Sequence, residues 1–385
     1  MTTRHDIIVV GAGPAGLAAA LEADHRGHDV AIVAPPRSGR DERTAALLAG
    51  SVDLLERLGV WPHVAAKAAP MRSLRIVDAT RRLFRAPEVT FHASEIGLPA
   101  FGFNVRNADL VDALEARVAD CGLPRFATTV DRVSPEADAV VLGLASGDDV
   151  STRLVVAADG RRSKVRDSIG IDVREWRYDQ SALVVNLAHA LPHNDTSTEF
   201  HTEAGPFTLV PLPGRRSSLV WVDRPSEVAR RLDMSEAALA DEIEARASSL
   251  LGTITIDGPR QAFPLAGMTA NGFAASRAIL VGEAAHLFPP IGAQGLNLGY
   301  RDVAALGDIL PDPGGDPGAP ARLAAYERAR RPDVLSRTAA VDALNRTLLT
   351  GFLPVQALRG LGLFLLDRIP SLRHAVMRQG VSSPN

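Results

Sequence analysis

The sequence predicts an α/β fold, in which a three-layer, Rossmann-like nucleotide-binding domain carries an inserted antiparallel β-sheet and a helical C-terminus. Three observations support this prediction. The chain opens with a strand, a glycine-rich turn, a helix and a second strand over residues 6–33. Residues 173–263 read as short strands rich in Val, Leu and Thr. A buried parallel strand then returns at residues 277–282, and helical patterns continue to the end of the chain.

The opening segment carries a GxGxxG spacing, formed by Gly11, Gly13 and Gly16. Gly11 allows a tight turn, Gly13 lets the backbone approach a pyrophosphate, and Gly16 lets helix and strand pack closely. The helix that follows, to about Arg26, presents free N–H groups and a partial positive charge to the phosphates. This strand–loop–helix–strand context predicts dinucleotide binding, and a glycine-rich turn in another kind of α/β protein is the alternative.

The second strand of this unit, residues 30–33, lacks the acidic residue that usually follows it. Such folds offer Asp or Glu to the adenosine ribose about 20 residues past the glycines. Here residues 34–36 read Ala-Pro-Pro, which cannot accept those hydrogen bonds. Asp41 or Glu42 could substitute, and the sequence does not decide between them.

Length and composition limit the classes of protein that fit. The 385-residue chain is long enough for two domains. Its 42 Lys and Arg against 45 Asp and Glu give a net charge of −3, without the basic excess typical of nucleic-acid binders. The single cysteine, Cys121, excludes an internal disulfide, and we expect its side chain to be buried. We find no signal peptide and no apolar run of roughly 18 residues that would span a bilayer, so we expect a cytoplasmic protein.

Apolar periodicity predicts the remaining elements. They are, in order, a helix over residues 44–58 that ends at Gly59, strands within 71–91, a helix over 107–119 capped by Asn107, short strands over 130–156, and an acidic helix over 235–247. The segment STRLVVAADG, residues 151–160, is expected to be a buried strand that ends at Asp159-Gly160.

Strand-ending motifs recur three times, at residues 11–16, at Asp159-Gly160 and at Gly282-Glu283. The third is followed by a P-x-G-x-x-G-x-N pattern, formed by Pro290, Gly292, Gly295 and Asn297. In this order the motifs resemble those of the aromatic-hydroxylase class of single-component flavoprotein monooxygenases, which share the fold of para-hydroxybenzoate hydroxylase. Within that class the chain is most similar to the ubiquinone-biosynthesis hydroxylases. The segments that carry this second resemblance are residues 43–61, FGFNVRNADLVDAL at 101–114 and GPFTLVPLP at 205–213.

The resemblance implies a domain division and a role for each motif. The FAD-binding domain would comprise residues 1–75, 95–172 and 264–335, the substrate domain 76–94 and 173–263, and a C-terminal helical region 336–385. The residues expected at FAD are Gly11, Gly13, Ala15 and Gly16 at the pyrophosphate, Asp159 near the cofactor and the nicotinamide donor, Gly282 and Glu283 at the ribitol, and Pro289, Gly292, Gln294, Gly295, Leu296 and Asn297 at the isoalloxazine ring. Glu283 stands where the family has Asp, so its longer side chain shifts the loop or makes the contact indirect.

Elementary physics also supports the assignment around the isoalloxazine ring. Gly292 and Gly295 remove side chains where a flat ring would lie against backbone. A helix over residues 296–306 would point its N-terminus at that ring, and its free N–H groups and dipole would stabilise the anionic reduced flavin.

Several single residues have two readings. Arg43 and Arg106 either contact the cofactor phosphates or ribitol or form surface ion pairs. Trp221 and Phe207 are either core residues or walls of a substrate pocket. We interpret His286 as a structural hydrogen-bonding residue and Asp302 as a helix-packing or capping residue, rather than as catalytic groups.

The C-terminal region also has two readings. Residues 348–369 are rich in Leu and Phe, and five arginines against two aspartates follow residue 341. One interpretation is a helical cap on the flavin domain. The other is an amphipathic surface that contacts the inner face of a membrane, or a partner holding a lipid substrate.

The resemblance implies aromatic hydroxylation with non-covalent FAD, dioxygen and either NAD(P)H or a protein electron donor. Reduced FAD would form a C4a-hydroperoxide whose distal oxygen passes to a polyprenylated phenol of ubiquinone biosynthesis, through a pocket with an apolar mouth beneath the inserted sheet. Because the cofactor carries this chemistry, the chain needs no nucleophile or metal cluster. The alternatives are a hydroxylase of a small soluble aromatic and a non-catalytic flavoprotein scaffold of a biosynthetic complex.

Overall fold

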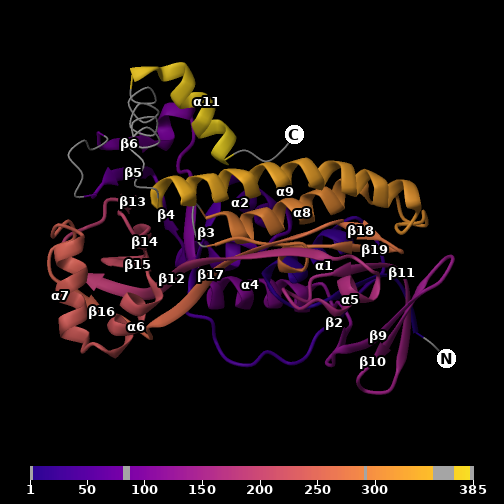
Figure 1. Cartoon of the computed structure of the whole chain (residues 1–385). Coiled ribbons are helices and arrows are strands. Elements are labelled where there is room, and N and C mark those ends of the chain that lie inside the picture. Colours follow the sequence, from indigo (N-terminus) through magenta and orange to yellow (C-terminus); the bar gives the residue numbers. More distant parts are fainter. Residues whose placement is uncertain (1–2, 81–86, 290–292, 350–367, 382–385) are drawn as a thin grey trace.

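The computed structural model describes residues 3–80, 87–289, 293–349 and 368–381 (Figure 1). Its first sheet has a parallel centre in which β1 lies between β11 and β2, as the opening βαβ unit predicts. The strands, in spatial order, are β18 (Ala274–Ala275), β19 (Ala278–Leu280), β11 (Asp149–Ala157), β1 (Thr3–Val10), β2 (Val30–Val33) and β8 (Arg125–Phe126), with β10 (Val140–Leu144) and β9 (Val130–Pro135) added antiparallel to β11.

Helices cover this first sheet and complete its layers. They are α1 (Pro14–His25), α4 (Asn107–Asp120), α5 (Lys164–Ser168), α8 (Gln294–Ile309) and α9 (Pro320–Leu349). Helix α1 packs against α4 and α8, and α9, drawn in orange, runs alongside α8 (Figure 1). The main hydrophobic core lies between these helices and the parallel strands, whose central residues Ile7, Ile8 and Val9 have no exposed surface.

The second sheet is almost entirely antiparallel, as residues 173–263 predict; β13 and β5 form its parallel pair. Its strands, in spatial order, are β20 (His286–Leu287), β17 (Gln261–Ala270), β12 (Val173–His189), β15 (Arg216–Asp223), β14 (Pro206–Leu212), β13 (Thr196–His201), β5 (Ser73–Asp78) and β6 (Val89–His92), with β16 (Ile254–Ile256) paired to β12. Helices α6 (Pro225–Asp233) and α7 (Glu236–Arg246) cover its outer face (Figure 1).

A small third sheet joins the two larger ones, and its strands are β3 (Thr44–Leu48), β7 (Gly102–Arg106) and β4 (Ala69–Pro70). The other elements are α2 (Ala49–Arg57), α3 (Trp61–Val64), α11 (Pro370–Val381) and the 3-10 turns η1 (Ala65–Lys67), η2 (Ala93–Ile96) and η3 (Gly282–Ala284). Helix α11, drawn in yellow, lies beside β6 (Figure 1), where its Met377 is buried against Phe91 and Phe101.

Three local predictions were wrong. Residues 44–48 are a strand, not the start of a helix, because they pair with β7; the approach is so close that a Cβ at Gly102 would lie 1.9 Å from the Leu47 carbonyl oxygen. Asn107 does not cap α4, because it is the first helical residue and its side chain donates to Asp41. Cys121 is half-buried rather than buried.

Candidate active site

The glycine loop between β1 and α1 surrounds an open space. A Cβ at Gly11 would lie 2.2 Å from the Ala158 carbonyl oxygen, and one at Gly16 would lie 2.2 Å from the Gly11 carbonyl oxygen. Both glycines are therefore required by the fold itself. Gly13 differs, because a Cβ there would meet no atom within 4 Å and its φ of −73° and ψ of 173° suit any residue. The fold does not need a glycine at this position, so the empty space is available to a ligand.

The parallel pairing of β1 with β11 brings the second motif to this loop, since Val10 lies opposite Ala157 and Asp159 follows directly. The Asp159 Oδ2 atom accepts a 3.3 Å hydrogen bond from the Val165 N–H, whereas Oδ1 is buried and has no hydrogen-bond partner among the described residues. Burial raises the pKa of this carboxyl group, and the nearby Ser163 hydroxyl and backbone N–H groups only partly offset that effect. An unpartnered carboxylate oxygen needs a donor such as a ligand hydroxyl.

The third motif packs onto the first through Ala15. Cβ atoms built at Gly282 and Gly299 would lie 3.2 and 3.3 Å from the Ala15 side chain. These small residues let η3 and the first turns of α8 approach the beginning of α1. The three motifs, which are separated by more than a hundred residues in the chain, therefore meet at one edge of the parallel sheet.

The loop after β2 forms another side of the site. Arg43 pairs with Asp41 at 2.7 Å, and its guanidinium carbon lies 4.8 Å from the ring centre of Phe263 on β17. The hydrogen bond to Asp41, followed in importance by the charges of Asp41 and Glu283, raises the pKa of Arg43 against the opposing effect of burial. Arg43 and the exposed Glu283 thus lie in the same neighbourhood.

The candidate ribose acids and Arg106 all take part in ion pairs. Asp41 accepts from Arg43 and from the Asn107 amide, while a Glu42 carboxylate oxygen lies 3.6 Å from Arg106 Nη1. Arg106 also donates to Asp109 at 2.6 Å. The choice between Asp41 and Glu42 for the ribose stays open.

The N-terminus of α8 presents the residues expected at the isoalloxazine ring. Gly295 is exposed, and a Cβ there would meet no atom of the described residues within 4 Å, as at Gly13. No side chain caps this helix, whose N-cap residue Ala293 has the left-handed φ of 54° that non-glycine residues rarely adopt. Pro289 is buried and Leu296 half-buried. The remaining expected residues, Pro290 and Gly292, lie outside the described part of the chain.

The side chains of Asn297 and Gln294 form hydrogen bonds with other residues of the protein. Asn297 Oδ1 accepts from the Leu48 N–H at 2.8 Å and the Ser51 hydroxyl at 2.7 Å, and its amide donates to the carbonyls of Ala46 and Ala293. These four bonds use the full capacity of the amide, so Asn297 joins α8 to the junction of β3 and α2. Gln294 Oε1 accepts from Arg337 of α9 at 3.1 Å. Both residues lie in the first turn of α8, and their side-chain oxygens are bonded to other residues of the protein.

His286 and Asp302 have the structural roles that the sequence predicts. His286 Nε2 donates to Asp302 Oδ2 at 2.7 Å, and the Gly282 N–H donates to the same oxygen. Arg330 of α9 donates to the other oxygen at 2.7 Å. Burial acts to raise the pKa of Asp302, but the charges of His286 and Arg330 outweigh it and hold the pKa below its ordinary value. Asp302 therefore fixes the turn that carries Glu283.

Phe207 and Trp221 are core residues. Their rings meet edge to face at 5.0 Å, and Arg231 of α6 covers Trp221 at 3.7 Å from the ring centre. Both belong to the hydrophobic cluster beneath α6 and α7, on the outer face of the second sheet. Asn186, on the opposite face, donates to the Glu42 carbonyl and so faces the nucleotide-binding domain.

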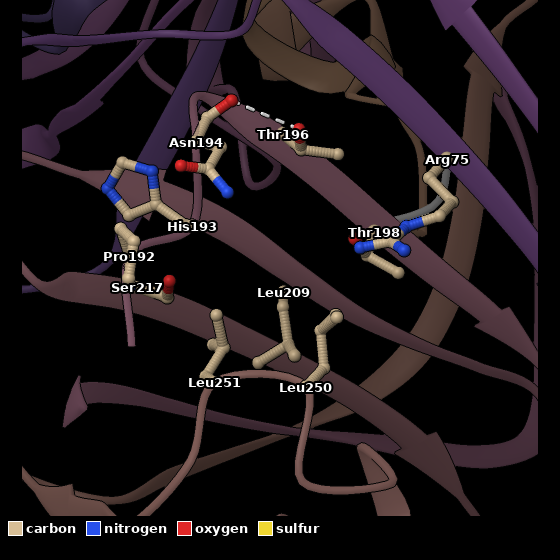
Figure 2. Close-up of a pocket in the computed structure, with 10 residues that line it drawn as sticks. All are labelled: Arg75, Pro192, His193, Asn194, Thr196, Thr198, Leu209, Ser217, Leu250 and Leu251. Atoms are coloured by element: carbon tan, nitrogen blue, oxygen red, sulfur yellow. Dashed lines mark hydrogen bonds between the residues drawn. The ribbon is translucent and has the colours of Figure 1, made fainter. Parts of the chain in front are cut away.

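A cavity of about 100 Å³ lies on this outer face (Figure 2). Its lining residues are Arg75, Pro192, His193, Asn194, Thr196, Thr198, Leu209, Ser217, Leu250 and Leu251. Ser217 pairs with Leu187, and both Leu187 and Leu209 belong to the cluster beneath α7. The cavity is therefore separate from the site described above, and it is not the substrate pocket expected beneath the sheet.

Sequence reasoning missed Phe263, Tyr326, Arg330, Asp333 and Arg337. The last four lie on α9, where the segment YERARRPD, residues 326–333, contains a dense group of charged residues. Tyr326 and Arg330 are fully buried, and Tyr326 donates to the Leu280 carbonyl at 2.8 Å. Within the described ranges, the helices include none that is both long enough and apolar enough to cross a membrane.

The open spaces at Gly13 and Gly295 and the unpartnered Asp159 oxygen fit FAD. The first space suits a pyrophosphate at the start of α1, the second suits a flat ring at the start of α8, and the carboxylate suits a hydroxyl of the ribityl chain or the ribose. These features come from the three motifs that the sequence singles out.

Comparisons with known proteins agree with this geometry. The FAD binding domain family matches residues 4–340. Ubiquinone hydroxylase UbiL of Rhodospirillum rubrum is 35% identical over 98% of this chain and 90% of its own length. The 3-demethoxyubiquinol 3-hydroxylase of Escherichia coli is 32% identical over 97% of both chains. The human mitochondrial ubiquinone biosynthesis monooxygenase COQ6 is 27% identical over 97% of this chain and 92% of its own length.

Solved structures show the same fold. The p-nitrophenol 4-monooxygenase PnpA of Pseudomonas putida superposes with a TM-score of 0.78 at 18% identity, over 100% of both chains. HpxO of Klebsiella pneumoniae, solved with FAD and uric acid, gives 0.77 at 19% identity over 97% of this chain and 96% of its own. The chain therefore belongs to the FAD binding domain family, and it is an FAD-dependent monooxygenase.

Proposed function

We propose that this enzyme hydroxylates the aromatic ring of a polyprenylated phenol in ubiquinone biosynthesis. The observation that carries the proposal is the near full-length similarity to two ubiquinone hydroxylases at more than 30% identity. Bound FAD, once reduced, activates dioxygen so that one oxygen atom can be transferred to an electron-rich ring. The chain's own residues bind and orient the reactants.

In this proposal the start of α1 holds the FAD pyrophosphate, because Gly13 leaves the backbone accessible and the helix dipole favours the negative charge. Asp159 accepts a hydrogen bond from a hydroxyl of the cofactor. The N-terminus of α8 would hold the flavin ring, and its N–H groups would stabilise negative charge on the reduced form. Arg43, Glu283 and Phe263 form the rim of the cofactor site. Glu283 reaches the ribitol with a side chain one methylene longer than the family's Asp.

FAD is held without a covalent bond, and the electron donor is NAD(P)H or a protein. Acid or heat should release the cofactor as FAD, because the glycine loop binds a pyrophosphate and FMN has none. Chromatography of the released flavin tests this. Recovery of FMN, or of flavin only after proteolysis, contradicts it.

The C-terminus supplies an argument for a lipid substrate. On and just before α11, Ile369, Leu372 and Val376 are exposed large apolar side chains at helical spacing. The helix is anchored beside this stripe, since Arg373 pairs with Glu95 and its guanidinium carbon lies 4.5 Å from the ring centre of Phe91. An apolar stripe on an anchored helix with exposed Arg378 fits contact with an anionic membrane surface, where a polyprenyl tail resides.

Complementation tests the substrate. A strain that lacks demethoxyubiquinol hydroxylation should regain ubiquinone when it expresses this chain, and should not with Gly13→Val. If the strain accumulates its precursor unchanged while the purified enzyme hydroxylates small phenols, the soluble-aromatic alternative is correct. If no phenol is hydroxylated by flavin-loaded protein, the scaffold alternative is correct.

Vesicle sedimentation tests the membrane contact. Wild-type protein should sediment with vesicles containing anionic phospholipid, and Leu372→Glu should remain in the supernatant. Leu191→Glu, at an exposed leucine in the connection after β12, is the matched control and should sediment like wild type. Equal sedimentation of Leu372→Glu and Leu191→Glu would show that α11 does not bind lipid.

A further inference from the structure

A chain of buried charges joins α9 to both flanks of the segment that faces the flavin. On one flank, Asp302 receives the Gly282 N–H, His286 and Arg330. Arg330 then donates to Asp333 at 2.7 Å. On the other flank, Arg337 donates a hydrogen bond to Gln294, the first residue of α8.

Asp333 is the centre of this network. Arg301 donates to it at 2.8 Å, Arg330 at 2.7 Å and Arg337 at 3.0 Å. Burial acts to raise the pKa of Asp333, but the hydrogen bonds and charges of Arg301 and Arg330 hold it well below its ordinary value. Arg337 uses Nε for Asp333 and Nη1 for Gln294 Oε1, so one planar guanidinium fixes both partners at a set angle.

The network also carries an excess of positive charge. Among the residues that the structure describes, three guanidinium groups, of Arg301, Arg330 and Arg337, face two carboxylates, of Asp302 and Asp333. The side chains of Arg330 and Asp302 are each 1% exposed, so water screens the charges there weakly. This excess lies behind the end of α8 that is uncapped and already positive through its dipole.

We propose that Arg337 is a positioning residue of the flavin site: by clamping Gln294 it fixes the N-terminus of α8, and its charge adds to the field that favours reduced flavin. The Ala293 backbone, which is left-handed, needs such a constraint to hold the helix start in place. The proposal rests on the placement of the flavin ring at α8 given above. It assigns the clamp to a residue outside the three motifs.

A double-mutant cycle on Arg337 and Gln294 tests the clamp, with FAD affinity as the readout. Arg337→Met and Gln294→Met should each weaken FAD binding about tenfold, and the double variant should be no weaker than either single variant. Arg331→Met is the matched control, since Arg331 lies on the same helix and pairs with Glu327 at the surface; it should bind FAD like wild type. Thermal unfolding of the FAD-free proteins checks that each variant folds.

The reduction potential tests the charge. Arg337→Met should lose affinity for reduced FAD about fivefold more than for oxidised FAD, which lowers the two-electron potential by about 20 mV. Arg337→Lys keeps the positive charge beside Asp333 but cannot bond to Asp333 and Gln294 at the same time. It should therefore keep the wild-type reduction potential and bind FAD more weakly. Because Arg337→Lys preserves the ion pair, it decides the question even if Arg337→Met does not fold.

The proposal is overturned if Arg337→Lys and Arg337→Met bind FAD like wild type, or if the effects of the two single variants multiply in the double variant. An unchanged potential in Arg337→Met overturns the electrostatic part. These measurements need no phenolic substrate, so their failure is distinct from a failure of the proposed hydroxylation.

Discussion

Gly13→Val should separate FAD binding from folding. The Gly13 backbone has φ −73° and ψ 173°, an extended conformation that valine accepts, and a Cβ there would meet no atom within 4 Å. The free energy of unfolding of the FAD-free protein should therefore change by no more than about 1 kcal/mol. In the complex, the branched side chain fills the pyrophosphate space. Losing two hydrogen bonds to a charged group costs about 3 kcal/mol, which is roughly 100-fold in Kd.

The assay measures FAD affinity by the fluorescence of the flavin and stability by urea unfolding of the FAD-free protein. Gly272→Val is the control, since Gly272 also lacks a positive φ and a Cβ there would only touch Ile171 at 3.9 Å. It should bind FAD like wild type. A Gly13→Val protein that purifies with full FAD content would refute the assignment of the glycine loop to the FAD pyrophosphate. A Gly13→Val protein that is unfolded without FAD would refute the claim that the fold itself tolerates a side chain at this position.

Three further predictions follow from single carboxylates. Glu283→Ala should weaken FAD binding by about 0.5–1.5 kcal/mol, the usual value of one hydrogen bond, and an unchanged affinity in a titration would show that Glu283 does not reach the cofactor. Asp159→Asn should raise the unfolding temperature of the FAD-free protein at pH 7, because burial raises the pKa of Asp159 and makes its charged form costly. That gain should disappear as the pH falls below 3.8, the ordinary pKa of the carboxyl in the unfolded chain, and a gain that persists there contradicts the cause. Folding lowers the pKa values of Asp302 and Asp333, so the stability that these carboxylates contribute is present above pH 3.8 and is lost as the pH falls below it. Urea unfolding at pH 7 and at pH 3 measures this loss, which should be smaller in Asp302→Asn than in wild type.

Local patterns were enough to predict the elements that carry cofactor-binding motifs. The β-branched run before Gly11, the Ala-rich helix after it and the strand at residues 30–33 are visible in short windows, because each depends on its own spacing. The alternation within residues 173–263 likewise predicted an antiparallel sheet. Residues 44–48 were misread as helix because their strand is defined by pairing with Gly102, more than fifty residues away. No local pattern encodes that contact.

In the candidate site, too, local patterns predicted positions but not the contacts that the tertiary fold creates. The positions of Gly13, Asp159 and Gly295 could be predicted because motif spacing places them at strand ends and helix starts. The partners of Gln294 and Asn297 could not, since they come from α9 and from the β3–α2 junction. Arg337 acts on the site through packing of α9 on α8, a contact that depends on the tertiary fold alone.

Isotope labelling tests the central claim most directly. Enzyme with reduced FAD is mixed with a demethoxyubiquinol that bears a short isoprenoid tail, under ¹⁸O₂, and the product is analysed by mass spectrometry. The account predicts one new ring hydroxyl that carries one ¹⁸O atom, and no product from Gly13→Val. A product whose new oxygen comes from water, or oxidation of FAD with no hydroxylated product, would contradict it.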